Sequence, residues 1–118
     1  MLYYSAQWSY PAAAWKEAVC DHFKSESGRS TLDFRCFNPE RPGTAGNRDE
    51  IHSALVYGAP AGLLATLPKL RATLSISAGI DHVLSDRSYP RETVAVLRMV
   101  NRHQITMMGH FAVHRMLD

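Results

Sequence analysis

Two short runs of small residues interrupt apolar stretches of the sequence, and each could bind an anion through its backbone. One run is YGAP at residues 57–60, and the other is SAG at residues 77–79. Small side chains let a ligand approach backbone N–H groups closely. Where a helix begins directly after such a run, its unpaired N–H groups and the positive end of its dipole point at the same place. A carboxylate or a phosphate suits this chemistry.

Local chemistry alone leaves a plainer interpretation of the second run open. Gly79 would then only permit a tight turn between a strand and a helix, and Asp81 would be an acid in the first helical turn, where it favours the helix dipole. His82 lies beside the same turn and could donate a proton there. The sequence favours instead a histidine that faces solvent or caps the helix.

The sequence carries none of the common motifs of catalytic or cofactor sites. G-x-G-x-x-G, G-x-x-x-x-G-K-[ST], G-x-S-x-G and H-E-x-x-H are all absent. His110 and His114 have the spacing of one helical turn and could share a metal ion, but no Cys, Asp or Glu lies close by before Asp118 to complete a coordination shell. The sequence therefore predicts no catalytic, cofactor-binding or metal-binding residue in this chain.

Five short apolar runs predict the strands that would position the two runs of small residues. In the segment 31–37, apolar residues alternate with polar ones, which indicates a strand near the edge of a sheet, with one side in water. Because helical segments lie between most of the strands, parallel crossovers and a three-layer α/β sandwich are expected. Ligands of such sheets bind beyond the carboxyl ends of the strands. The strands are predicted at 2–5, 31–37, 53–57, 74–76 and 93–97.

Helical spacing of apolar residues predicts the segments between the strands. Ser9 and Pro11 supply the start signals of the first helix, which runs through Phe23 and ends within 25–30. Residues 38–50 are rich in Pro, Gly and Asn and predict a mobile connecting loop. Three more helical segments are predicted, at 63–67, 80–84 and 105–117.

The composition is that of an ordinary globular domain and argues against several kinds of partner. With 118 residues, 46% of them hydrophobic, the chain has the size of one domain with a core. A net charge of +2 without a basic cluster argues against a nucleic-acid partner. The sequence has neither a signal peptide nor a run of about 20 apolar residues, which predicts no membrane contact. Cys20 and Cys36 lack metal-ligand spacing and predict reduced thiols in a cytoplasmic protein, with a disulfide between them as the alternative.

Residues 71–84, RATLSISAGIDHVL, resemble the signature of the D-isomer-specific 2-hydroxyacid dehydrogenases, in which a strand is followed by G-A-G-x-D-x-I-L. Three further segments are similar to the glyoxylate/hydroxypyruvate reductase A branch of that family. They are an aromatic first strand with Trp15 in the helix that follows, ALVYGAP at 54–60 for A-L-V-W-x-x-P, and MGHFAV at 108–113 for M-x-E-Y-A-V, with His110 in place of the acid. The resemblance extends in order over essentially all 118 residues.

The resemblance implies that residues 1–118 are the N-terminal, substrate-binding portion of an NAD(P)-dependent 2-hydroxyacid dehydrogenase. The implied fold is a flavodoxin-like three-layer sandwich with a five-stranded parallel sheet. Enzymes of the family hold the carboxylate of a small 2-oxo or 2-hydroxy acid on backbone amides of the turn after the fourth strand. The resemblance therefore assigns substrate binding to Ala78 and Gly79, with Tyr57 and Gly58 lining the same pocket.

The resemblance also implies partners for this chain. The family's dinucleotide-binding domain, with its G-x-G-x-x-G, and its catalytic Arg, Glu and His match no segment of these 118 residues. NAD(P) is therefore implied for the full-length family, with no cofactor in this chain, which is expected to be inactive alone. The closing helix would expose an apolar face without that domain, and an exposed patch favours a homo-oligomer. The face consists of Ile105, Met108, Ala112 and Met116, with Phe111 and Leu117 beside it.

A non-enzymatic flavodoxin-like module for binding or regulation is the alternative function. A receiver domain would need an acidic cluster near the end of the first strand, and residues 4–7, YSAQ, offer none. A flavin carrier would need a phosphate loop rich in hydroxyl groups there, and Ser5 and Ser9 are too few and too widely spaced. Both features disfavour the alternative, and flavin bound to the purified protein would establish it.

Overall fold

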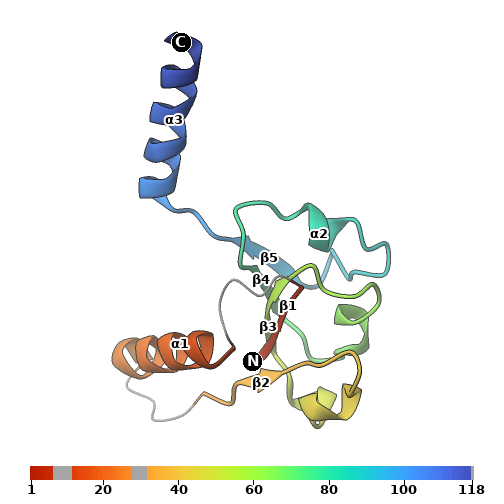
Figure 1. Cartoon of the computed structure of the whole chain (residues 1–118). Helices are drawn as coiled ribbons and strands as arrows, with labels where there is room; N and C mark the ends of the chain where they lie inside the picture. The colour runs from red at the N-terminus through yellow and green to blue at the C-terminus, as the bar shows by residue number, and fades with distance from the viewer. Residues whose placement is uncertain (7–11, 28–31, 118) are drawn as a thin grey trace.

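The fold is an open sheet of five strands in the order β2-β1-β3-β4-β5 (Figure 1). The computed structural model describes residues 1–6, 12–27 and 32–117. All four strand pairs are parallel, which confirms the predicted α/β sheet, and β2 lies at an edge, as its alternating pattern indicates. This strand order is that of flavodoxin-like folds. The strands are β1 (Leu2–Ser5), β2 (Arg35–Cys36), β3 (Ser53–Tyr57), β4 (Ala72–Ser75) and β5 (Ala95–Arg98).

Successive residues of the central strands face opposite sides of the sheet and build two separate cores. One core contains Tyr3 and Leu55 and lies under α1 (Ala12–Ser27). The other contains Leu2 and Val56 and is covered by short turns instead of a long helix. The sheet is thus the middle of three layers, one of them thin. That thin layer consists of the 3-10 turns η1 (Pro42–Ala45) and η3 (Leu64–Thr66) and the helix α2 (Asp81–Leu84), which bury Ala45, Leu64 and Val83.

Strand boundaries differ from the predicted ones where backbone groups turn away from the sheet. β4 ends at Ser75 instead of residue 76, because the N–H of Ser77 bonds back to the Ser75 hydroxyl. β5 begins at Ala95 instead of residue 93, because the N–H groups of the two preceding residues donate to the carbonyl of Pro90. β2 has only two residues. The helix predicted at 63–67 is a single 3-10 turn, and the predicted start signals Ser9 and Pro11 lie outside the described residues.

The loop predicted at 38–50 contains two 3-10 turns, η1 and η2 (Arg48–Glu50), which Arg35 holds beside β2. The Arg35 guanidinium donates to the carbonyl of Ala45 at 3.3 Å and pairs with the Glu50 carboxylate at 2.5 Å. The segment is therefore a connector with defined turns, and it contributes buried Ala45 to the core.

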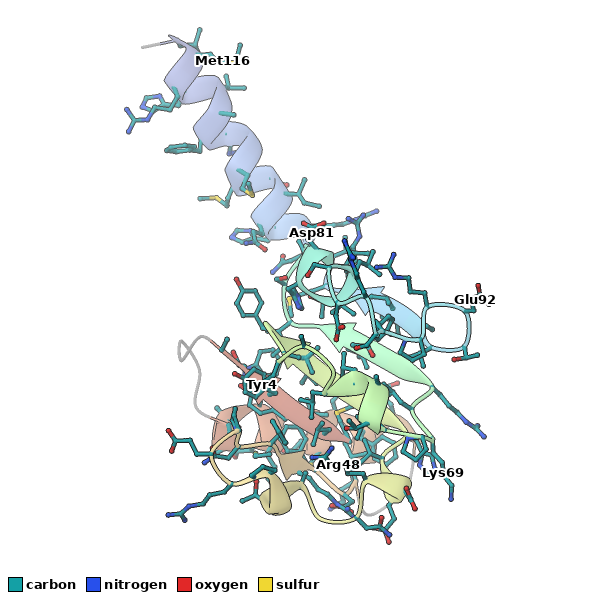
Figure 2. All side chains as sticks on the ribbon, turned by 90° about the vertical axis from the view of Figure 1, so that its right-hand side faces the viewer. Tyr4, Arg48, Lys69, Asp81, Glu92 and Met116 are labelled. Carbon is teal, nitrogen blue, oxygen red and sulfur yellow. The ribbon has the colours of Figure 1, made fainter. Side chains whose placement is uncertain are left out.

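The last helix, α3 (Arg102–Leu117), projects away from the sheet and covers neither face (Figures 1 and 2). It begins three residues before the predicted start, because the Asn101 side chain accepts a hydrogen bond from the N–H of Gln104 at 3.2 Å. None of its residues is buried, and Met116 is 85% exposed. Among the described helices, none is long and apolar enough to cross a membrane.

Candidate functional site

The two runs of small residues lie side by side at the carboxyl edge of the sheet. β3 and β4 are neighbouring strands, with Val56 opposite Ser75, so the two strands end next to each other. The N–H of Ile76 donates to the carbonyl of Val56 at 3.0 Å and fixes the start of the second run against the end of β3. The topology therefore brings together the four residues that the sequence singled out for substrate binding.

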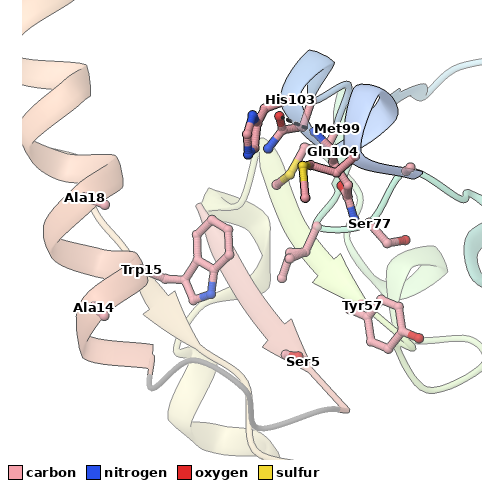
Figure 3. A pocket seen from close by; sticks show the side chains of 13 residues that line it. Ser5, Ala14, Trp15, Ala18, Tyr57, Ser77, Met99, His103 and Gln104 are labelled. Atoms are coloured by element: carbon pink, nitrogen blue, oxygen red, sulfur yellow. Dashed lines mark hydrogen bonds between the residues drawn. The ribbon is translucent and has the colours of Figure 1, made fainter. Parts of the chain in front are cut away.

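An open cleft of about 910 Å³ lies at this edge, between α1 and the beginning of α3 (Figure 3). Tyr57 and Ala78 line it from the ends of β3 and β4, and Trp15 lines it from α1. Gly58 and Gly79 follow these two residues in the chain without lining the cleft themselves. The cleft has the size of a small-molecule site, about 300–1,000 Å³.

The second run offers two unpaired hydrogen-bond donors. Among the described residues, the N–H groups of Ala78 and Gly79 donate to no protein acceptor, and both residues are exposed. Gly79 has no positive φ, and a Cβ added to it would meet only Oδ2 of Asp81, at 3.8 Å, an ordinary contact. The backbone conformation therefore does not require glycine here, which argues against the plainer interpretation of Gly79 as a residue that only permits a turn.

Gly58 lies in a turn of the other kind, one that only glycine fits well. Its φ is +61°, in the left-handed region, and a Cβ added to it would lie 2.9 Å from the Cβ of Ala6. The N–H of Ala6 donates to the carbonyl of Tyr57 at 2.9 Å, so this close approach belongs to the pairing of β1 with β3. The fold itself requires glycine at this predicted site residue.

His82 joins the two runs instead of facing solvent or capping a helix, so that prediction was wrong. At its half-buried ring, Nδ1 accepts a hydrogen bond from the N–H of Gly58 at 3.3 Å, and Nε2 lies 2.9 Å from the Ser75 hydroxyl oxygen. The ring of Tyr57 lies beside it, with 5.1 Å between the ring centroids. Burial lowers the pKa of His82 below its ordinary value, against the opposing charge of Asp81. The folded protein therefore favours the neutral imidazole.

Hydrogen bonds of two serine hydroxyls hold residues 77–79 in their turn. The buried Ser75 hydroxyl donates to the carbonyl of Gly79 at 2.8 Å and accepts from the N–H of Ser77 at 3.2 Å. The Ser77 hydroxyl donates to the same carbonyl, also at 2.8 Å. Sequence reasoning missed Ser75, although a hydroxyl inside an otherwise buried strand was a signal that it has partners.

The charges near residues 77–79 give an anion little help and partly disfavour its binding. α2 has only four residues, so its dipole is much weaker than that of a long helix, and the expected help from its N-terminus is small. Asp81 is exposed and its carboxylate lies close to Gly79, where it repels a carboxylate ligand. An anion at this turn would therefore depend on the unpaired N–H groups of Ala78 and Gly79.

The described residues offer neither a metal site nor a dinucleotide site. No group of three or more His, Cys, Asp or Glu side chains among them could hold a metal ion. His110 and His114 lie on the exposed helix α3. No strand of the described sheet is followed by the glycine-rich turn that receives a dinucleotide pyrophosphate.

Solved dehydrogenase structures share this fold, whereas no family model and no curated protein matches the chain. The chain is similar to a D-isomer specific 2-hydroxyacid dehydrogenase from Xanthobacter autotrophicus Py2, solved in complex with NADPH and MES, with a TM-score of 0.74 and 26% identity. That match covers 98% of this chain and 34% of the dehydrogenase chain. A second D-isomer specific 2-hydroxyacid dehydrogenase structure from the same organism matches with a TM-score of 0.65 and 23% identity, over 96% of this chain and 32% of that one.

The chain thus spans about a third of the length of the solved dehydrogenases that it matches. The match at 23% identity shows a common fold. The match at 26% identity covers almost the whole chain, including residues 71–84, whose sequence resembles the dehydrogenase signature. The similarity supports a relationship of this chain to the D-isomer specific 2-hydroxyacid dehydrogenase family.

Proposed function

We propose that residues 1–118 are the substrate-binding domain of an NAD(P)-dependent 2-hydroxyacid dehydrogenase of the glyoxylate/hydroxypyruvate reductase type. In this proposal the domain binds the carboxylate of a small 2-oxo or 2-hydroxy acid. The observation that carries it is the pair of exposed, unpaired N–H groups of Ala78 and Gly79 beyond the carboxyl end of β4. Open parallel sheets bind their ligands at this edge, and the similar dehydrogenase shares the fold.

The cleft beside these donors has room for the rest of a small acid. Two N–H groups can each donate to the carboxylate, and hydrogen bonds to an ionised acceptor are stronger than those to a neutral one. Tyr57 and Ala78 line the cleft near the donors, and Trp15 and Met99 add apolar surface for the carbon skeleton. Gly58 contributes by setting the turn that carries Tyr57.

The residues of this chain do not fit NAD(P), so no hydride-transfer step is assigned to them. The similar dehydrogenase was solved with NADPH, and a dinucleotide needs a glycine-rich turn before a helix, which no described strand of this chain has. We propose that a dinucleotide-binding domain is the partner that supplies the nicotinamide. The present chain would bind the acid and would be inactive alone.

α3 is the surface through which we propose that the chain contacts that partner. The apolar side chains of this helix are not confined to the face predicted from the sequence, since Met107 and Val113 are exposed on other sides, and none of the helix residues is buried. Chains without a dinucleotide-binding domain would associate through α3 as a homo-oligomer. Sedimentation tests this, since Met108→Glu should shift the oligomer towards monomer. The unpaired Cys20 and Cys36 suit the proposed cytoplasmic location.

Amide NMR of the ¹⁵N-labelled chain tests the proposed carboxylate site. Oxalate serves as a stable analogue of a 2-oxo acid, and oxamide, the uncharged diamide of similar shape, serves as the control ligand. We expect the resonances of Ala78, Gly79 and Ile80 to shift saturably with millimolar oxalate and to stay in place with oxamide. Shifts confined to other residues would contradict the proposal. Flavin in the purified protein would favour a flavodoxin-like binding module instead.

A further inference from the structure

The His82 side chain connects the ends of two strands. Its Nδ1 accepts from the N–H of Gly58, which lies 24 residues earlier in the chain. Its Nε2 lies 2.9 Å from the hydroxyl oxygen of Ser75, the last residue of β4. Because His82 itself belongs to α2, three segments meet at one imidazole ring.

These hydrogen bonds determine which ring nitrogen carries the proton. A backbone N–H can only donate, so Nδ1 of His82 must be unprotonated where it meets Gly58. The neutral ring then has its proton on Nε2, which donates to Ser75. With this bond the Ser75 hydroxyl makes one donation, to Gly79, and accepts twice, from His82 and from the N–H of Ser77. The Ser77 hydroxyl oxygen lies 3.1 Å away as well, but its own proton goes to the Gly79 carbonyl, so the one proton and the two acceptor sites of the Ser75 hydroxyl are all used.

The hydrogen bonds of Ser75 also hold the peptide groups next to the unpaired N–H groups of Ala78 and Gly79. The Gly79 carbonyl accepts from the hydroxyls of both Ser75 and Ser77. Beyond the end of the β4 ladder at Ser75, these side-chain hydrogen bonds hold residues 77–79 together with one backbone bond, from the N–H of Met99 to the carbonyl of Ser77 at 3.4 Å. Ser75 is 3% exposed, so water has little access to its hydroxyl. A continuous series of hydrogen bonds therefore leads from Gly58 through His82 and Ser75 to the carbonyl of Gly79, next to the two unpaired N–H groups.

We propose that His82 is a positioning residue for the carboxylate site. Neutral and protonated on Nε2, it holds the Gly58 turn and residues 77–79 in one fixed arrangement, which preorganises the N–H groups of Ala78 and Gly79. Donors that are already aligned bind a ligand without a further loss of conformational entropy. The identity of the ligand rests on the proposed function, whereas the coupling between the two turns does not.

Three variants separate the two hydrogen bonds of the imidazole. His82→Asn keeps an acceptor near the position of Nδ1, His82→Gln keeps a donor near Nε2, and His82→Ala removes both. We expect His82→Ala to weaken oxalate binding about tenfold. His82→Gln should recover most of that loss, because it keeps the bond to the serine that holds the donors. His52→Ala is the matched control, since His52 is exposed and precedes β3 at the opposite edge of the sheet.

Two measurements on the ligand-free protein test the coupling separately from the ligand. Ring ¹⁵N spectra should show a protonated Nε2 and an unprotonated Nδ1 at His82. Exchange of the Gly58 amide hydrogen should be about tenfold faster in His82→Ala and His82→Gln than in the wild type, and close to wild type in His82→Asn. A proton on Nδ1, or unchanged Gly58 exchange in His82→Ala, would overturn the inference.

The outcomes distinguish this inference from the proposed function. If the wild type fails to bind oxalate but shows the expected tautomer and exchange pattern, the proposed function fails and the coupling stands. If oxalate binds equally well to wild type and His82→Ala, the carboxylate site stands and the positioning role of His82 fails. If His82→Ala does not fold, His82→Gln and His82→Asn decide the question, because each keeps one of the two bonds.

Discussion

The turns after β3 and β4 both contain a glycine, but the two glycines answer different physical demands. Gly58 has a φ of +61°, and an added Cβ would lie 2.9 Å from Ala6. Gly79 has no positive φ, and an added Cβ would have space. The backbone therefore explains Gly58 fully and leaves Gly79 unexplained. A glycine at the end of a strand is evidence for a ligand only where the backbone conformation and the space for a Cβ do not themselves require glycine.

The largest effect on stability is expected from Gly58→Ala. A left-handed φ costs a residue with a Cβ about 1–2 kcal/mol, and the close contact with Ala6 adds to this, so the free energy of unfolding should fall by about 2 kcal/mol. Urea denaturation measures the change. Gly43→Ala is the control, since Gly43 has no positive φ and no atom within 4 Å of an added Cβ. Equal losses in the two variants would contradict a backbone requirement for glycine at position 58.

The sequence predicts the sheet better than it predicts the ends of the strands. β1 and β3 have the predicted boundaries, because their apolar runs stop where the chain turns. β4 and β5 do not, since their ends depend on hydrogen bonds made by Ser75 and Pro90. α3 has the predicted helical pattern, but no local pattern states whether a helix packs on its own sheet. That depends on tertiary contacts.

The candidate site could be located from the sequence, whereas its internal support could not. Small residues after two apolar runs marked the carboxyl edge of the sheet, and β3 and β4 place them together there. The partners of His82 are a backbone group 24 residues away and a serine seven residues away, and only the pairing of the strands makes them neighbours. Sequence spacing carries no record of such a contact.

Acid should loosen the Gly58 turn before it affects residues 77–79. Burial lowers the pKa of folded His82 below the ordinary value of about 6.5, while Asp81 raises it and the Tyr57 ring packs beside it. The unfolded chain therefore takes up this proton first as the pH falls. The contribution of the neutral ring to stability is complete above about pH 6.5 and is lost as the pH falls from there towards the lower folded pKa.

Denaturation curves of wild type and His82→Gln between neutral and mildly acidic pH measure this loss as a difference. The wild type should lose more stability than the variant, and amide NMR should show Gly58 shifting before Gly79. The order follows because protonation removes the acceptor at Nδ1, whereas Nε2 can still donate to Ser75. If both proteins lost the same unfolding free energy as the pH falls, protonation of His82 would make no contribution to the loss.

The smallest effect on stability, and the sharpest test of the comparison, is expected from Gly79→Ala. An added Cβ meets only Oδ2 of Asp81 at 3.8 Å, so the free energy of unfolding should change by no more than about 0.5 kcal/mol. Oxalate binding should nevertheless weaken, because the methyl group narrows the approach to the neighbouring N–H groups. Gly43→Ala makes the same chemical change far along the chain and should leave binding intact. If Gly79→Ala binds oxalate as well as the wild type, the open space at Gly79 is not an approach path, and the carboxylate must reach the two donors from another side.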